Sequence, residues 1–257
     1  MDVDAVNANT FVAPDAKVYY DDEGFIALKP DATKGINPFE KTKLKKNPLK
    51  LWKEGLFEMA SQDFATLDKE GGKDGKDDID VRLKWFGLFH RRKQQYGKFM
   101  MRLKLPNGVV TSAQLAFLAD VVERYGTDGC GDITTRQNFQ LRGIELPDVP
   151  EIFEGLERVG LTSIQSGMDN VRNAVGNPLA GIDPIEVVDT IPICNDLNEY
   201  ITAKGQGNRR ISNLPRKWNV CVVGSQDLYE HPHINDVWLF TRCDLHAHIT
   251  PGTAQRN

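Results

Sequence analysis

Apolar and polar residues alternate in three stretches of the chain, and this period of two predicts β-strands. The stretches are residues 98–105, 132–146 and 212–224. One face of each stretch is mainly apolar, so we expect strands with one buried face. The other face carries Arg or Lys in every case. In the second stretch this polar face comprises Thr134, Arg136, Asn138, Gln140 and Arg142.

Apolar residues at a spacing of three to four predict helices between these strands. The expected helices begin at Asn37-Pro38, at Thr111 or Ser112 and near residue 148, the last ending at Gly160, with a further helix from Pro184 to about Lys204. Residues 68–80 (DKEGGKDGKDDID) are rich in Gly, Asp and Lys and predict a loop. The strand–helix–strand–helix order in the middle of the chain predicts an α+β fold with a ferredoxin-like layer.

Composition excludes several classes of protein. No apolar run approaches the roughly 20 residues of a membrane-spanning helix. The net charge of −4 gives no global basic field, and aromatic residues do not interleave with the basic runs, which argues against nucleic-acid binding. The four cysteines, at positions 130, 194, 221 and 243, match no close-set metal or cluster motif. We therefore expect reduced thiols and no metal site built from this chain.

Basic residues concentrate in two runs, Lys41–Lys53 and Arg82–Lys104. Such runs are either solvated faces or docking surfaces for an acidic partner. The polar faces of the predicted strands also carry cations without acidic residues, and Arg172 adds another in a glycine-bearing segment. If these side chains converge, they form a cationic pocket for a small anion or for a ligand with several carboxylates. If they do not, they are unrelated surface charges.

Four segments resemble motifs of the siroheme nitrite and sulfite reductase family. They are FMMRLKLPNGV (99–109), DITTRQNFQLRGI (132–144), GMDNVRNAVGNP (167–178) and NLPRKWNV (213–220), in the family's order. The resemblance covers about residues 37–236. It implies siroheme and a coupled [4Fe-4S] cluster as cofactors, reduced ferredoxin as the electron donor, and reduction of nitrite to ammonium.

The resemblance also implies roles for individual residues. Arg102, Arg172, Lys217 and Asn219 match positions that surround the substrate anion above the haem iron. Arg136, Gln140 and Arg216 match positions that hold the siroheme carboxylates. Sulfite enzymes of the family resemble one another in having a lysine where this chain has Asn219, so the resemblance favours nitrite.

The resemblance implies four segments. We expect an extended N-terminal arm (1–36), a helical region with the ferredoxin-like half-domain (37–160), the first part of a siroheme-binding α+β domain (161–236) and a tail unlike the family (237–257). Family members are about twice as long, and their cluster cysteines lie in the second half. We therefore expect an N-terminal half that lacks the cluster ligands.

The tail carries Cys243, His246 and His248, which are either accidental or a small zinc or copper site. The resemblance favours a monomer. The resemblance implies the plastid stroma for a plant or algal source and the cytoplasm for a cyanobacterial one, and no transit peptide is visible in the sequence. Two alternatives to nitrite reduction stay open, a sulfite reductase fragment and a non-catalytic module that binds ferredoxin or an anion.

Overall fold

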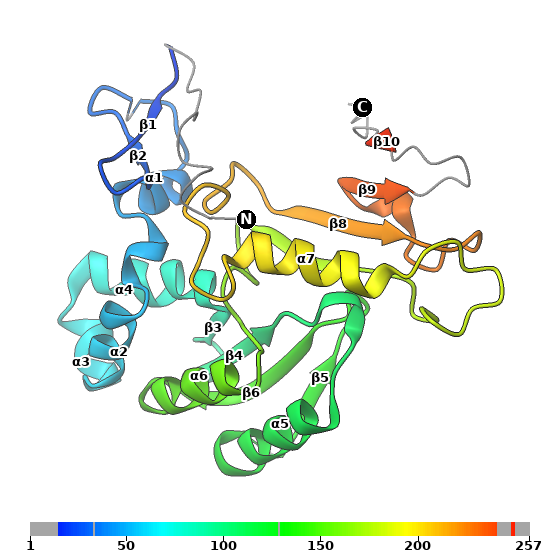
Figure 1. Cartoon of the computed structure of the whole chain (residues 1–257). Coiled ribbons are helices and arrows are strands. Elements are labelled where there is room, and N and C mark those ends of the chain that lie inside the picture. Colours follow the sequence, from blue (N-terminus) through cyan, green and yellow to red (C-terminus); the bar gives the residue numbers. More distant parts are fainter. Residues whose placement is uncertain (1–14, 33, 128, 241–247, 250–257) are drawn as a thin grey trace.

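Two four-stranded sheets form the framework of the computed structural model, which describes residues 15–32, 34–127, 129–240 and 248–249 (Figure 1). The first sheet is antiparallel, in the order β3–β4–β6–β5. Its strands are β3 (Leu88–Arg91), β4 (Gln95–Leu103), β5 (Gly131–Ile133) and β6 (Phe139–Glu145). The second sheet has the order β10–β9–β8–β7, with β7, β8 and β9 parallel. Its strands are β7 (Val171–Val175), β8 (Trp218–Val223), β9 (Val237–Phe240) and β10 (His248–Ile249).

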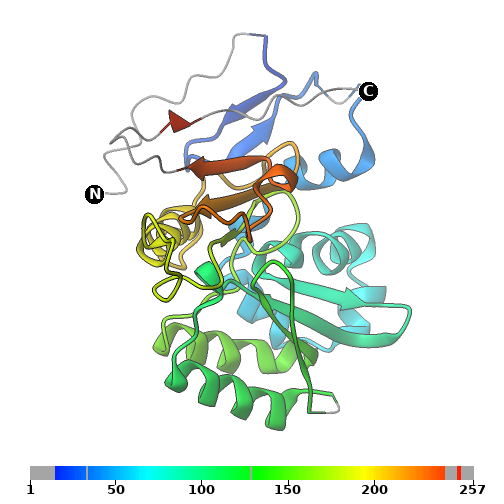
Figure 2. The same cartoon turned by 90° about the vertical axis from the view of Figure 1, so that its right-hand side faces the viewer.

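Helices cover both sheets, and a small hairpin of β1 (Val18–Tyr20) and β2 (Ile26–Leu28) precedes them. The helices are α1 (Pro38–Lys45), α2 (Glu54–Ala60), α3 (Phe64–Lys69), α4 (Gly72–Asp80), α5 (Ser112–Tyr125), α6 (Val149–Arg158) and α7 (Thr190–Thr202). Short 3-10 turns are η2 (Pro48–Leu51), η3 (Arg82–Phe86), η4 (Pro106–Gly108), η5 (Leu146–Asp148) and η6 (Pro232–Ile234). Figures 1 and 2 show α5 and α6 side by side at one end of the molecule and α7 alongside β8. The predicted α+β class is confirmed. Within the described part of the chain, no helix combines the length and apolarity needed to cross a bilayer.

The main core lies between the antiparallel sheet and the helices α2, α5 and α6. Phe99, Met101 and Leu103 of β4 are wholly buried there, together with Leu118 and Ile152. The three β4 residues are positions that the alternating pattern assigned to the apolar face. A second, smaller core under the parallel sheet packs α7 against β7 and β8.

The opposite face of β4 is also covered, which the sequence did not predict. Met100 is 7% exposed and Lys104 only 1% exposed, although both lie on the face expected to meet solvent. The segment before β7 lies beside the end of β4, where Lys104 forms an antiparallel bridge with Thr162 and its main-chain N–H donates to Thr162 O at 2.9 Å. A strand buried on both faces by two different layers cannot be told from a half-buried strand by alternation alone.

Residues 132–146 form a hairpin and not the single strand that we expected. The chain turns between β5 and β6, where Thr134 N–H donates to Asn138 O at 3.0 Å. Gln137 in this turn has a φ of 55°, which is unusual for a residue with a side chain. Arg136 therefore lies in the turn, while Gln140 and Arg142 lie on β6, and the predicted common face is wrong. Neither Gly nor Pro occurs in the turn, so the usual breaker signal is missing.

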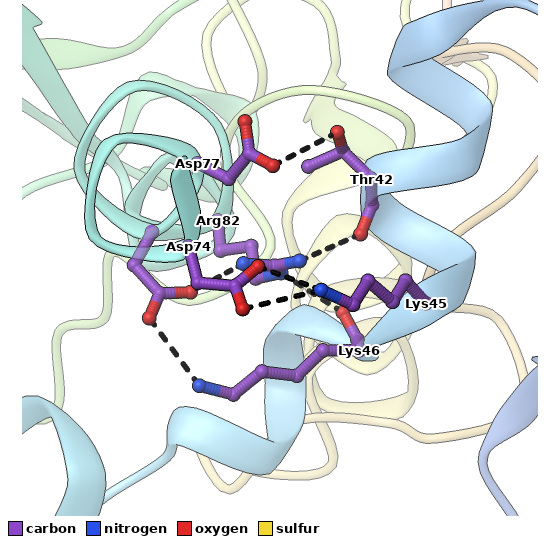
Figure 3. A network of polar contacts seen from close by, with 7 residues as sticks. Thr42, Lys45, Lys46, Asp74, Asp77 and Arg82 are labelled. Carbon is purple, nitrogen blue, oxygen red and sulfur yellow. Dashed lines mark hydrogen bonds and ion pairs between the residues drawn. The ribbon is translucent and has the colours of Figure 1, made fainter. Parts of the chain in front are cut away.

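The predicted loop at 68–80 is also wrong, because α4 and the end of α3 occupy it. Polar contacts to α1 stabilise α4 in addition to the burial of its Ile79 in the main core (Figure 3). Arg82 is 1% exposed, forms a 2.6 Å ion pair with Asp78, and donates to Thr42 O at 2.9 Å. Lys45 forms a further ion pair with Asp74 at 2.9 Å. Such long-range pairing is invisible in a composition that resembles a flexible loop.

Other helix predictions hold to different extents. Thr111 is the N-cap of α5 and forms a capping box with Gln114, as expected from a Thr at that place. Helix α6 ends beside Gly160, whose φ is +71°. The helix expected from Pro184 begins only at Thr190, with Asp189 as its N-cap. The helix expected from Asn37 is divided into α1, η2 and α2.

Most lysines of the first basic run form ion pairs within the chain, whereas in the second run the ion pairs involve Arg82, Arg92 and Lys98. Lys43 is buried and lies 2.6 Å from Asp169, while Lys50 lies 2.7 Å from Asp21. In the second run, Arg92 forms ion pairs with Asp68 and Asp80, which hold the pKa of Arg92 well above its usual range. This pairing favours internal structural roles over a free docking surface.

We predict that Arg82→Ala lowers the free energy of unfolding by about 3 kcal/mol, because it removes the close ion pair to Asp78, which keeps only the longer contact to Lys46, and leaves the main-chain acceptors Thr42 O and Lys46 O without their donor. Urea denaturation followed by circular dichroism measures this change. Lys45→Ala is the matched control in the same network and is expected to have little effect, since the Lys45 and Asp74 side chains are 63% and 64% exposed. An equal loss in both variants would contradict the special role of Arg82.

Candidate anion and cofactor site

Four arginines from separate segments come within electrostatic range of one another. Arg102 lies on β4, Arg136 in the turn before β6, Arg172 on β7 and Arg216 just before β8. Burial lowers the pKa of Arg172 to about 10, and the charges of the other three arginines contribute to this shift. Burial also lowers the pKa of Arg102, and the charge of Arg136 adds to it. The convergence that the sequence left open is therefore present in the structure.

Arg172 and Arg102 are each held by neighbouring groups that carry no negative charge. The two terminal nitrogens of Arg172 donate to Ser166 O at 3.2 Å and to Met168 O at 2.9 Å. The guanidinium carbon of Arg102 lies 4.7 Å from the centre of the Phe89 ring. An aromatic face and main-chain carbonyls orient a guanidinium but do not neutralise it.

Arg136 is positioned by a clamp between its turn and β7. The side-chain nitrogen of Asn173 donates to Leu105 O at 2.7 Å and to Arg136 O at 3.1 Å. The Gln137 side chain binds both the N–H and the carbonyl of Gly176, at 3.1 and 2.9 Å. We did not predict Asn173 or Gln137 as site residues. The only signal was their place beside Arg172 and Arg136 within the segments that resemble the family motifs.

The cluster has unused hydrogen-bonding capacity. The Nε atoms of Arg102 and Arg172 are buried and have no hydrogen-bond partner. Within the described ranges, none of the four arginines forms an ion pair with a carboxylate of this chain. Asp169, the acidic residue that raises the pKa of Arg172, is already paired with Lys43 at 2.6 Å. Buried cations without counter-ions are costly, so the arrangement suits an external ligand with several negative charges.

The remaining predicted residues lie on the strands that flank this cluster. Gln140 on β6 is directly opposite Arg102 on β4. Lys217 and Asn219 flank Trp218, which is opposite Val171 in the parallel sheet. Arg216 and Lys217 are exposed, whereas Asn219 is partly buried and its main chain is tied to Asp236 by bonds of 2.8 and 3.0 Å. The roles assigned to these residues stay predictions.

Lys104 is a further cation beside the cluster, and we did not predict it as a site residue. Its Nζ donates to Val171 O at 3.0 Å, next to Arg172, and the residue is 1% exposed. Burial and the charge of Arg172 lower the pKa of Lys104 to about 7. The alternating pattern placed Lys104 on the basic face but could not show that this face is covered.

Two of the described cysteines, Cys194 and Cys221, are buried and free. Burial raises the pKa of Cys194 and of Cys221 to about 12, so both are thiols and not thiolates at neutral pH. In the described ranges, no three His, Cys, Asp or Glu side chains gather in a way that could hold a metal ion. Cys243 and His246 of the candidate zinc or copper site lie outside those ranges.

The antiparallel, helix-backed sheet and the second sheet both contribute to this arginine cluster, within an α+β fold. Two family models match this chain, the nitrite/sulfite reductase ferredoxin-like half domain at residues 90–159 and the nitrite and sulphite reductase 4Fe-4S domain at residues 167–243. The chain belongs to the nitrite and sulfite reductase family. The second match continues beyond Asp236 and includes β9, part of the segment that we expected to be unlike the family.

Relatives with curated names support the same assignment. The chain is 66% identical over 216 residues to the chloroplastic ferredoxin–nitrite reductase of Arabidopsis thaliana, an alignment with 84% of this chain and 36% of that protein. It is 50% identical over 206 residues to the ferredoxin–nitrite reductase of Leptolyngbya laminosa, which covers 80% of this chain and 39% of the relative. The chain thus spans little more than a third of the length of these relatives.

A solved structure has a similar fold. The Mycobacterium tuberculosis NirA protein superimposes with a TM-score of 0.68 at 30% identity, covering 83% of this chain and 40% of that one. The similarity therefore extends over both sheets and is not confined to short motifs.

We predict that Lys104→Met raises the free energy of unfolding at pH 7 by about 1–3 kcal/mol, because it removes a buried cation without a carboxylate partner. The folded-state pKa of Lys104, about 7, lies below the unfolded value of 10.5, so the unfolded chain binds more protons between these values. Wild-type stability therefore rises with pH through this window, and the advantage of the variant shrinks toward pH 10. Urea denaturation at the two pH values measures the effect.

The exposed Lys93, changed to Met, is the control for the loss of one lysine charge. It is expected to leave the unfolding free energy nearly unchanged at both pH values, since Lys93 is exposed. A Lys104→Met variant that is less stable than wild type at pH 7 would overturn the prediction.

Proposed function

We propose that this chain forms the siroheme-carboxylate and nitrite-binding face of a ferredoxin-dependent nitrite reductase. The observation that carries the proposal is the arginine cluster around Arg172, which is half-buried, has unused donors and lacks carboxylate partners in the described chain. Siroheme carries many carboxylates, and Arg forks bind such groups in a bidentate manner. The chemistry of the residues therefore fits the cofactor.

In this proposal Arg136, Gln140 and Arg216 hold siroheme carboxylates, and Arg102, Arg172, Lys217 and Asn219 surround the substrate anion. Bound siroheme supplies the ferrous iron and the electron path for a six-electron, eight-proton reduction of nitrite to ammonium and two waters. The arginines of the chain stabilise negative charge on the departing oxygens, because fixed cations in a partly dry site require little reorganisation. Arg102 and Arg172 serve as permanent charges, while Lys217 can donate a proton.

Asn219 decides between nitrite and sulfite in this proposal. Sulfite at its higher charge favours a second lysine at this position, whereas the singly charged nitrite needs less positive charge. Sulfite reduction is accordingly the second candidate. A non-catalytic module that docks ferredoxin is less well supported, because ion pairs such as those of Lys43 and Lys50 neutralise most of the first basic run.

The remaining assignments are proposed from the family. Reduced ferredoxin is the proposed donor, and the [4Fe-4S] cluster is proposed for full-length members, without Cys194 or Cys221 as ligands. We also propose a monomer with the segments 1–36 and 37–160 and a second domain that begins near 161 and continues through β9. The proposed location is the plastid stroma for a plant or algal source, and the cytoplasm for a cyanobacterial one.

We predict that the chain, purified from a siroheme-producing host, shows a Soret band and a long-wavelength siroheme band. Arg136→Ala is expected to lower siroheme occupancy several-fold, because one carboxylate loses its charged partner. Absorbance spectra normalised to protein concentration give the occupancy. Arg124→Ala is the control, since Arg124 pairs with Glu151 on the exposed side of α5. A wild-type protein without absorbance beyond the protein band would contradict siroheme binding by this chain.

We predict that Asn219→Lys shifts anion preference of the siroheme-loaded protein toward sulfite by about tenfold, which corresponds to about 1.4 kcal/mol of added charge interaction. Titration of the siroheme spectrum with sulfite and with nitrite measures both affinities. Asn195→Lys, at an exposed position of α7, adds the same charge away from the cluster. Equal shifts in the two variants would mean that Asn219 does not set the preference.

A further inference from the structure

Lys104 lies next to Arg172, the arginine whose pKa is lowered to about 10. It follows Arg102 by two positions, so both leave the same side of the chain near the end of β4. Its Nζ donates to the carbonyl of Val171 at 3.0 Å, and the next residue along β7 is Arg172. The Lys104 residue is 1% exposed.

The surroundings of Lys104 offer its ammonium group little compensation. Val171 O is its hydrogen-bond acceptor, and no carboxylate pairs with it in the part of the chain that the structure describes. The segment 162–166, which covers it, contains no titratable side chain. The charged neighbours on the packed strands are Arg102 of β4 and Arg172 of β7, and the charge that acts on Lys104 is that of Arg172. Asp169, on the far side of Arg172, is occupied by Lys43.

We propose that Lys104 couples anion binding at the arginine cluster to proton uptake. An anion on Arg172 cancels the positive field that disfavours a second cation behind it. The Lys104 amine then takes a proton from solvent, forming one N–H bond, and no other bond changes. Anion binding thus draws a fraction of a proton into the protein, at most about one half for a tenfold change in proton affinity. This coupling rests on the proposed function, because the proposed reaction consumes protons. The coupling itself requires only the arginine cluster and an anion bound to it.

Burial and Arg172 lower the pKa of Lys104 to about 7, so both protonation states are populated near neutral pH. A lysine with its usual pKa of about 10.5 would already be protonated and could take up nothing. Both the position of Lys104 beside Arg172 and its lowered pKa therefore support proton uptake when an anion binds.

The test uses the 257-residue chain without cofactor and with ¹³C at the lysine Cε, followed by NMR as a function of pH. Sulfate is the probe anion, compared with chloride at equal ionic strength. Lys104→Met identifies the resonance by its loss, and Lys104→Arg does so if the Met variant does not fold. We expect a midpoint near 7 in chloride. Sulfate should raise it by about one unit, a tenfold change in proton affinity.

Arg172→Met separates coupling from a general salt effect. It should raise the Lys104 midpoint in chloride, because a like charge is removed, and it should abolish the sulfate response. Lys84 is the matched control, since burial also lowers its pKa, whereas the charge acting on it is that of Asp80, which raises it. Its resonance, identified with Lys84→Met, should not respond to sulfate.

A Lys104 midpoint that sulfate leaves unchanged would overturn the coupling, as would a sulfate response that persists in Arg172→Met. Neither measurement needs siroheme or turnover. A chain that binds no siroheme but shows the sulfate response would contradict the proposed function and leave the coupling intact. A siroheme-loaded protein whose apo form shows no response would contradict the coupling alone.

Discussion

The site depends on hydrogen bonds that join β7 and the segment before it to the end of β4. Asn173 donates to Leu105 O at 2.7 Å, Lys104 donates to Val171 O at 3.0 Å, and the hydroxyl of Ser166 donates to Arg102 O at 2.8 Å. These groups are buried, so losing one partner would leave the other unsatisfied in a poorly solvated place. The same bonds bring Arg102 and Arg172 together from different sheets. The same hydrogen bonds therefore attach the two sheets to each other and assemble the arginine cluster.

The clustered positive charges lower the stability of the folded state, and interactions elsewhere in the fold must offset this loss. Arginines that lower one another's pKa repel, and burial removes the water that would screen them. The apolar core on the opposite face of β4 supplies compensating stability, with Phe99, Met101 and Leu103 wholly buried. One strand thus serves the core with alternate residues and the site with the others. This division explains why the strand tolerates a face that is unfavourable for folding alone.

The sequence predicted those features that depend on local chemistry. The cap at Thr111, the alternation in β4 and the cations at 102, 136 and 172 were all visible as residue types at definite spacings. The turn at Gln137 was not visible in the sequence. Its left-handed backbone conformation is usually adopted by Gly or Asn, and Gln gives no such signal. Helix α4 was missed because part of its stability comes from contacts that it and the adjacent Arg82 make to α1, which is far away in sequence. The burial of Lys104 was missed because it depends on which layer covers β4, a property of the tertiary fold.

The N-terminal hairpin has an unexpected structural connection. The ring of Phe25, next to β2, lies 5.1 Å from the Lys50 ammonium and 4.7 Å from the Arg209 guanidinium. Arg209 also donates to Glu23 O at 2.9 Å. Lys50 belongs to the helical region, whereas Arg209 lies on the segment that leads to Arg216 and Lys217. The Phe25 ring therefore makes cation–π contacts with two parts of the chain that are distant in sequence. Any rearrangement of residues 18–28 would change the mechanical anchoring of the segment that presents Arg216 and Lys217.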